Sequence, residues 1–181
     1  MKKYLIVVMA AALALVGCKK KDNPALSPDD IQTYATLTGY VEYQRPVSVN
    51  SYGAVKVDNL PLANQVVEVM VSGSQYSSAS SASKVTYSFT GTTDSNGMFS
   101  ISVPVLKNGN GLNITKMSMR PFRLYSFPYP VNADGGWSIA NKTVYHSGSL
   151  SISAPATIYP DNSYFCGNEK ISYTSFQIVG Q

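Results

Sequence analysis

Hydrophobic and polar residues alternate along several stretches of the chain, and this period of two predicts β-strands. From Leu37 to Tyr43 every second residue is apolar or glycine, with polar side chains or Tyr40 between them. The stretches 84–90 and 99–103 alternate in the same way. Residues 65–71 are apolar on both faces, which favours a strand at the centre of a sheet.

A tight turn is predicted between two of these stretches, at residues 92–97. Asn96-Gly97 supplies residues that tolerate positive φ, and Pro104 ends the second apolar row. We therefore expect residues 84–104 to form a β-hairpin.

The segments around the first strand carry turn and loop signals. Arg45-Pro46 is expected to end that strand, and residues 47–60 to form a loop with at most a short edge strand at 54–57. The Ser/Ala/Gly-rich run 72–83 lacks periodicity and predicts a mobile surface loop.

The second half of the chain gives weaker signals for strands. We expect strands at 112–120, 137–144 and 150–154, and one at 171–178 whose alternation slips in phase and so suggests a bulge. Prolines keep 127–130 out of a central strand. The whole pattern predicts an all-β sandwich of about seven or more strands over residues 34–181.

The N-terminus has a different pattern, typical of a secretory signal peptide. Lys2-Lys3 precedes a dozen mostly apolar residues, too few for a spanning helix. Leu15-Val16-Gly17-Cys18 resembles the lipobox of bacterial lipoproteins. The alternative is a buried helix with a chance cysteine. We expect residues 1–17 to be a signal peptide, with a signal helix, and 18–33 to be a lipidated N-terminus and flexible tether.

The lipobox resemblance implies acyl chains on Cys18 and hence a membrane as the first partner. Several acyl chains give stable anchoring, which a single chain does not. Lys19 stands where an aspartate retains some lipoproteins at the inner membrane, so we expect anchoring in the outer membrane. The sequence does not distinguish its periplasmic side from its cell-surface side.

Composition excludes some classes of function. Charged residues make up only 13% of the chain, and the net charge of +4 falls to +2 without Lys2 and Lys3. No basic cluster follows the tether apart from Arg120 and Arg123, so no nucleic acid partner is expected. If Cys18 is lipidated, Cys166 has no partner for an internal disulfide, and we expect a buried, inert thiol.

Three motifs in the first half resemble the carboxypeptidase-regulatory-like, transthyretin-like β-sandwich. They are Gly39-Tyr40-Val41, then Pro61-Leu62-Ala63 before a Val-rich strand, and Thr93-Asp94-x-Asn96-Gly97 before an alternating run. Asn64 replaces the usual glycine and also tolerates the left-handed region. The resemblance covers about residues 36–104 and implies an immunoglobulin-like or transthyretin-like fold. It says almost nothing about function.

Candidate chemistry is sparse. A metal site needs two or more compatible ligands, and Cys166 is the one His or Cys residue that could join the single histidine, His146. We therefore expect His146 to be a residue at a turn or strand end. No Gly-x-Ser-x-Gly motif selects a nucleophile, and Asp94-Ser95-Asn96-Gly97 breaks the calcium-loop pattern. We therefore expect no enzyme activity, no metal and no cofactor.

The one feature that suggests binding is the density of aromatic residues after Pro121. Exposed rings stack on sugars, but β-sandwiches also fill cores with tyrosine. The candidate ligand-binding residues are Trp137, Tyr125, Tyr129, Tyr145, Arg120 and Arg123.

Three functions remain open from the sequence. The first is a non-catalytic module anchored in the outer membrane that contacts an envelope protein or has a structural role. The second is a glycan-binding accessory lipoprotein that uses exposed aromatics. The third is a fimbrial or adhesin-like subunit that accepts a partner strand.

Overall fold

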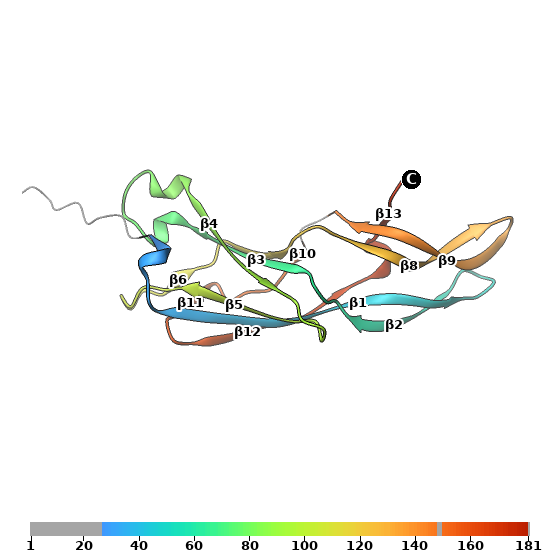
Figure 1. Ribbon diagram of the computed structural model, residues 1–181, viewed down its shortest axis with the longest axis horizontal. Coiled ribbons are helices and arrows are strands. Elements are labelled where there is room, and N and C mark those ends of the chain that lie inside the picture. Colours follow the sequence, from blue (N-terminus) through green and yellow to red (C-terminus); the bar gives the residue numbers. More distant parts are fainter. Residues whose placement is uncertain (1–26, 148–149, 181) are drawn as a thin grey trace, which may run out of the picture.

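The computed structural model describes residues 27–147 and 150–180 (Figure 1). The signal peptide, Cys18 and most of the tether lie outside the described residues, so what we predict for them stays a prediction. Within the described ranges, no helix combines the length and the apolar character needed to cross a membrane.

The described part of the chain is all-β, as predicted, with four short 3₁₀ turns and no longer helix. The strands are β1 (Tyr34–Val49), β2 (Val55–Pro61), β3 (Val66–Ser72), β4 (Thr86–Thr92), β5 (Met98–Pro104), β6 (Leu112–Asn113), β7 (Lys116–Met119), β8 (Phe122–Ala133), β9 (Gly136–His146), β10 (Leu150–Ser151), β11 (Thr157–Ile158), β12 (Ser163–Ile171) and β13 (Gln177–Ile178). The 3₁₀ turns are η2 (Pro28–Asp30), η3 (Gly73–Gln75), η4 (Ala82–Lys84) and η5 (Tyr173–Ser175).

Two sheets face each other around the main core. In the first, β1 pairs in parallel with β12 and antiparallel with both β5 and β2. The second has the order β10-β7-β3-β4, so the Val-rich strand β3 is central, as its apolar faces predicted. A third sheet, β13-β9-β8, and a short β11-β6 pair complete the pairing among the described residues.

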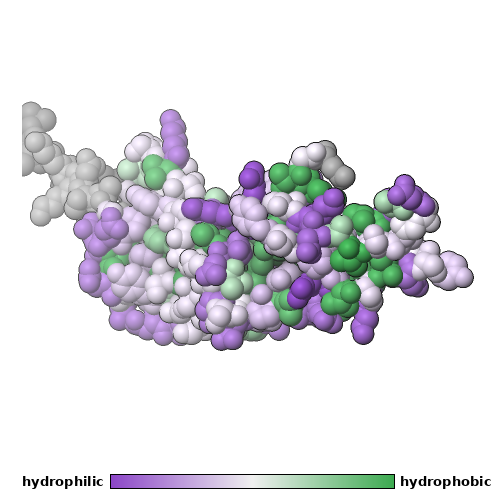
Figure 2. All heavy atoms as spheres, turned by 45° about the vertical axis from the view of Figure 1, so that its right-hand side comes forward, coloured by the Kyte–Doolittle hydropathy of each residue, from purple (hydrophilic) through white to green (hydrophobic). Residues whose placement is uncertain are grey.

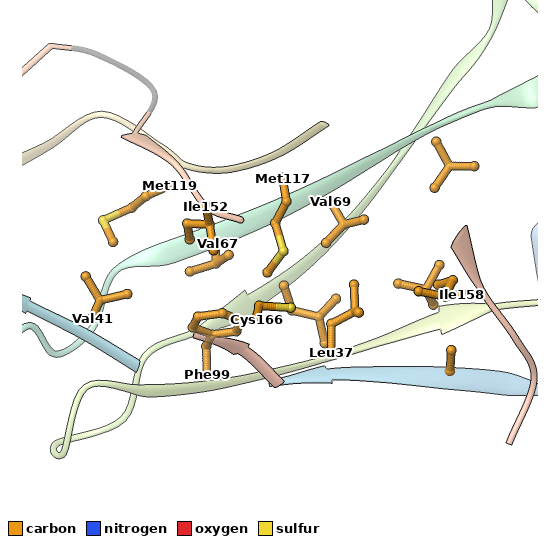
Figure 3. Close-up of a cluster of buried hydrophobic side chains, with 14 of the residues drawn as sticks. Leu37, Val41, Val67, Val69, Phe99, Met117, Met119, Ile152, Ile158 and Cys166 are labelled. Atoms are coloured by element: carbon orange, nitrogen blue, oxygen red, sulfur yellow. The ribbon is translucent and has the colours of Figure 1, made fainter. Parts of the chain in front are cut away.

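The core lies between the first two sheets, where alternating side chains point inward (Figure 3). Leu37 and Val41 of β1 and Phe99 of β5 are buried opposite Val67 and Val69 of β3. Thr36 and Thr38, at the alternate positions, are partly exposed. The apolar residues at every second position, which predicted these strands, are therefore the ones that are buried.

The body is elongated, with two long hairpins at one end (Figure 1). One hairpin is the second half of β1 with β2, and the other is β8 with β9. They pack on each other, and the rings of Tyr43 and Phe127 lie 6.1 Å apart between them. The described chain begins near the opposite end, at η2, so the first described residues and the hairpin tips mark the two poles.

The prediction that Arg45-Pro46 ends the first strand is wrong. β1 continues to Val49 and pairs with β2, with a register shift between Pro46 and Ser48. β12 pairs with β1 only as far as Tyr43. Pro46 therefore lies beyond the β1–β12 ladder, and its missing N–H removes no hydrogen bond from that ladder. Residues 47–60 are accordingly hairpin rather than loop.

The predicted hairpin over residues 84–104 is also wrong, although its turn is correct. The carboxylate of Asp94 accepts hydrogen bonds from the N–H groups of Asn96 and Met98, and Gly97 has φ +77°. However, β4 pairs with β3 and β5 pairs with β1. Thr93 N–H donates to Gln65 O, which keeps the end of β4 in the second sheet while the turn leads to the first.

Smaller differences occur in the second half of the chain. The expected strand 112–120 is split into β6 and β7, and only Leu150–Ser151 of 150–154 is strand. The phase slip within 171–178 is the 3₁₀ turn η5 rather than a bulge. Within the run 72–83, η3 and η4 form local turns where we expected an irregular loop.

Candidate functional site: the hairpin end

Trp137, the second residue of β9, lies on the turn of the facing hairpin. A Cβ built on Gly53 would be 2.8 Å from Cε2 of the indole and 3.0 Å from Nε1. The indole is therefore supported by the backbone of the β1–β2 turn. It is still 40% exposed, so part of the ring is open to solvent at the hairpin end.

Tyr52 is the most exposed large hydrophobic residue at this end, at 93%. It precedes Gly53 in a turn held by Asn50, whose side-chain oxygen accepts hydrogen bonds from the N–H groups of Tyr52 and Ala54 at 3.0 and 2.9 Å. The residue pattern predicts this turn but not the role of Tyr52, because Tyr52 lies outside the aromatic-rich second half. The sequence signal that could have identified Tyr52 is an aromatic residue inside a turn that runs from an asparagine to a glycine.

We define the hairpin tip as Tyr52, Gly53 and Trp137 together with the β8–β9 turn that carries Asp134. Asp134 and Gly135 in that turn have φ of +53° and +79°. Residues at the tip come from two turns that are far apart in sequence. In the space-filling view, apolar residues reach the surface toward the hairpin end among polar ones (Figure 2).

Tyr125 is displaced from the regular ladder by a bulge in β8. The register between β8 and β9 shifts between Leu124 and Phe127, and Ser126 in the bulge has φ +53°. Tyr125 is 73% exposed. Bulges commonly re-aim a side chain or end pairing at a sheet edge, and β8 is such an edge.

Arg123 and Tyr145 are direct cross-strand partners on β8 and β9. The guanidinium carbon lies 5.8 Å from the centre of the tyrosine ring, which is a cation–π distance. Tyr129 differs from both, because it is half-buried and its ring lies 6.5 Å from that of the core residue Phe127. Of the predicted binding residues, Tyr129 therefore serves mainly in packing.

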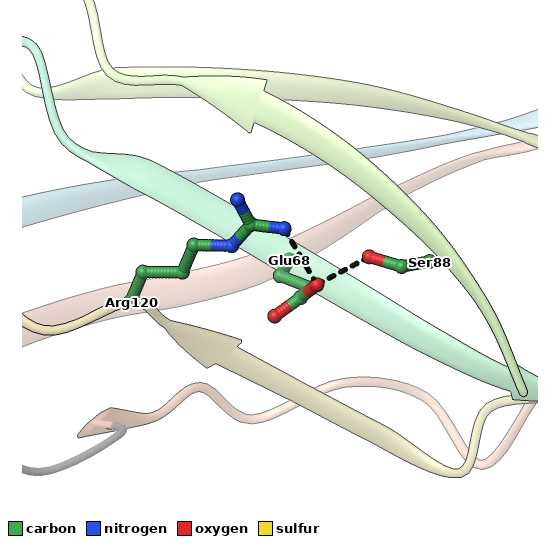
Figure 4. A network of polar contacts seen from close by, with 3 residues as sticks. All are labelled: Glu68, Ser88 and Arg120. Atoms are coloured by element: carbon green, nitrogen blue, oxygen red, sulfur yellow. Dashed lines mark hydrogen bonds and ion pairs between the residues drawn. The ribbon is translucent and has the colours of Figure 1, made fainter.

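Arg120 does not join Arg123. Its guanidinium contacts Glu68 of β3 at 2.8 Å, and Ser88 of β4 donates a hydrogen bond to the same carboxylate oxygen (Figure 4). The hydrogen bond from Arg120, followed by that from Ser88, holds the pKa of Glu68 below its ordinary value. This group links β3 and β4 to Arg120, which directly follows β7, whereas Arg123 belongs to β8 of the third sheet.

The remaining reactive side chains are buried. His146 ends β9 and stacks on Phe122, with ring centres 5.5 Å apart. Cys166 is a free, buried cysteine, as expected, and burial raises the pKa of its thiol. Among residues 27–147 and 150–180, no three His, Cys, Asp or Glu side chains are grouped so that they could hold a metal ion.

Comparison with protein-family profiles, with curated proteins and with solved structures returns no match. The transthyretin-like resemblance therefore remains a prediction.

Proposed function

We propose that this protein is a non-catalytic lipoprotein, anchored in the outer membrane through Cys18, that presents the hairpin tip to an envelope partner. The observation that carries this proposal is that the start of the described chain and the hairpin tip lie at opposite ends of the elongated body. The described chain starts near one pole, whereas the turns of the β1–β2 and β8–β9 hairpins lie at the other (Figure 1). Tyr52 belongs to the first of these turns, and Trp137 follows the second and contacts the first. An anchor joined to the body at the first pole leaves the opposite pole, with the hairpin tip, free to point away from the membrane.

The chemistry of the tip suits recognition by contact. Tyrosine and tryptophan provide a large contact area at a low cost in side-chain entropy, and they are the residues most enriched at binding hot spots. The backbone at Gly53 lies close against the indole of Trp137, which limits the space in which the ring can move before a partner binds. Preorganisation of this kind lowers the entropic cost of binding.

A second candidate is that the partner is a glycan. Trp137 is partly exposed, and Gly53 lies against one part of its indole. Tyr52 is the residue next to Gly53 in the chain. Flat exposed rings of this kind stack on the C–H faces of sugars, while neighbouring polar groups bind hydroxyls. The first candidate requires a protein at the tip, and the second a saccharide.

Photo-cross-linking on cells tests the proposal directly. A photoreactive amino acid is placed in the full chain at Tyr52, or at Tyr159 as the matched control, because Tyr159 is an exposed aromatic residue away from the tip. We expect a defined adduct from position 52 and none from position 159. Adducts from position 159 alone would contradict presentation of the tip.

A glycan array with the full chain in detergent distinguishes the two candidates. Binding that is lost in Tyr52→Ala and kept in Phe165→Ala would identify a glycan partner. Both side chains are largely exposed, so neither change removes core packing. A protein adduct at position 52 without array binding would favour the first candidate.

A further inference from the structure

Within the described ranges, no strand pairs with the outer edge of β4, and this edge is regular. β4 is the last strand of its sheet and pairs with β3 from Thr86 to Thr92 without a register shift. Gly73 N–H donates to Val85 O, and Thr93 N–H donates to Gln65 O. Hydrogen-bonded pairs alternate along an antiparallel ladder, so the odd-numbered residues of β4 bond to β3. The N–H and C=O groups of Thr86, Ser88, Thr90 and Thr92 therefore point outward.

The outer edges of β8, β12 and β2, by contrast, are interrupted or charged. β8 contains Pro128 and Pro130 in addition to its bulge. β12 has a register irregularity at Gly167, where φ is +91°. β2 carries Lys56 and Asp58. Prolines, bulges and charges are the common means by which proteins prevent strand addition.

The edge of β5 is regular but covered. A Cβ on Gly91 of β4 would lie 2.6 Å from Ser100 O, so the backbone of β4 passes directly over β5 at that point. The hydroxyl of Tyr76 donates a hydrogen bond to Pro104 O at 3.0 Å, at the other end of the strand. β4 thus covers the edge of β5, whereas the outer edge of β4 is not paired with any described strand.

We propose that two copies of this chain associate by antiparallel pairing of their β4 strands. The sequence Thr86–Thr92 is self-complementary about Phe89. In that register Ser88 faces Thr90 of the other copy and Thr86 faces Thr92, so the outward-pointing groups meet in hydrogen-bonded pairs. Four such pairs give about eight backbone hydrogen bonds.

The side chains in this register are compatible on both faces. Thr–Thr and Ser–Thr pairs lie on the exposed face, and such pairs stabilise antiparallel strands. On the inner face Tyr87, whose ring packs edge-to-face on Tyr76 of its own copy, lies opposite Gly91 of the other copy, so no second side chain is opposed to it. No charged side chain occurs within β4, so no like charges are opposed.

The two-fold axis of this pair runs perpendicular to the sheet, midway between the two Phe89 residues, so it reverses the long axis of the body. The first described residues of the two copies then lie at opposite ends of the pair. If Cys18 is the anchor, as the proposed function requires, this arrangement suits copies on facing membranes rather than neighbours upright in one membrane.

The oligomeric state of the full chain in detergent tests the pairing. We expect light scattering to give the mass of two protomers, and of one protomer for Thr90→Pro, which removes only an outward N–H. Thr90→Lys should act in the same way by placing a charge on the edge, and it covers the case in which the proline prevents folding. A monomeric wild-type chain at every concentration, or a dimer that persists in the folded variants, would overturn the proposal.

Disulfide trapping tests the register. Phe89 pairs with itself across the two-fold axis at a non-hydrogen-bonded site, where Cα atoms are about 4.5 Å apart and a disulfide is allowed. We expect Phe89→Cys to form a covalent dimer with a mild oxidant, and Asp58→Cys on the edge of β2 to form none. The reverse result would overturn the proposal. None of these outcomes depends on a partner at the hairpin tip.

Discussion

Gly53 supports Trp137 across the gap between the two hairpins, with a hypothetical Cβ on the glycine only 2.8 Å from the indole. Both the φ of +83° and this close approach favour glycine at position 53. The contact connects the two turns of the tip, so a change at either residue is expected to alter the other.

Gly53→Ala should lower the free energy of unfolding and displace the indole. We expect a loss of about 1 kcal/mol from the positive φ and about 1–3 kcal/mol more from overpacking against the ring. The chain has one tryptophan, so the emission of Trp137 reports the displacement without interference. Urea unfolding followed by circular dichroism measures the loss.

Gly135→Ala is the matched control for this change. Gly135 has nearly the same φ, +79°, but no atom lies within 4 Å of its hypothetical Cβ. Gly135→Ala should lose only the free energy of unfolding that comes from the positive φ, and it should leave the emission of Trp137 unchanged. Equal effects of the two substitutions would mean that the contact with Trp137 contributes nothing.

Tyr76→Phe should destabilise the protein by about 1 kcal/mol, the usual loss for one buried hydrogen bond. The buried hydroxyl donates to Pro104 O, and without it that carbonyl has lost its partner at the edge of β5. Burial also raises the pKa of Tyr76, so the hydroxyl stays protonated and can donate at any pH near neutral. Urea unfolding measures the loss. Tyr52→Phe, at a fully solvated hydroxyl, should leave the midpoint unchanged.

The stability contributed by Glu68 should disappear in acid. The pKa of Glu68 is lower in the folded protein than in the unfolded chain, mainly because Arg120 donates a hydrogen bond to the carboxylate. Its contribution is therefore complete above the unfolded pKa and is lost as the pH falls through the folded pKa. Glu68→Gln should be slightly less stable than the wild type at neutral pH and should match it at low pH.

The expected size of this difference is small, because Arg120 is largely solvated and exposed ion pairs contribute little. Urea unfolding of both proteins across the acid range measures it. A difference that grows in acid would contradict the assignment.

The alternating pattern predicted the strands of the sandwich because burial at every second residue leaves a local signal. Leu37, Val69 and Ile101 are buried as their patterns predicted. The pairing of β4 and β5 left no such signal. Asp94-Ser95-Asn96-Gly97 forms the same local turn whether the following strand returns to its own sheet or crosses to the other one.

The candidate site was predictable only in part, for a similar reason. The aromatic density of the second half identified Trp137 and Tyr125, and both are exposed. Tyr52 comes from the first half, and its place beside the glycine that supports Trp137 depends on the packing of two hairpins. The separation of Arg120 from Arg123 likewise follows from β7 and β8 belonging to different sheets.

Thiol counting should distinguish a lipidated from an unmodified Cys18. Cys18 and Cys166 are the only cysteines of the chain. In the native protein Cys166 should react slowly with a thiol reagent, because it is buried and burial raises its pKa, so little thiolate is present. In denaturant Cys166 becomes accessible whatever the state of Cys18. A thioether at Cys18 cannot react, so the membrane-extracted chain should release one thiol on unfolding and Cys166→Ala none. Two reactive thiols in the extracted wild-type chain, or one in Cys166→Ala, would show an unmodified Cys18 and would remove the basis for the proposed anchor.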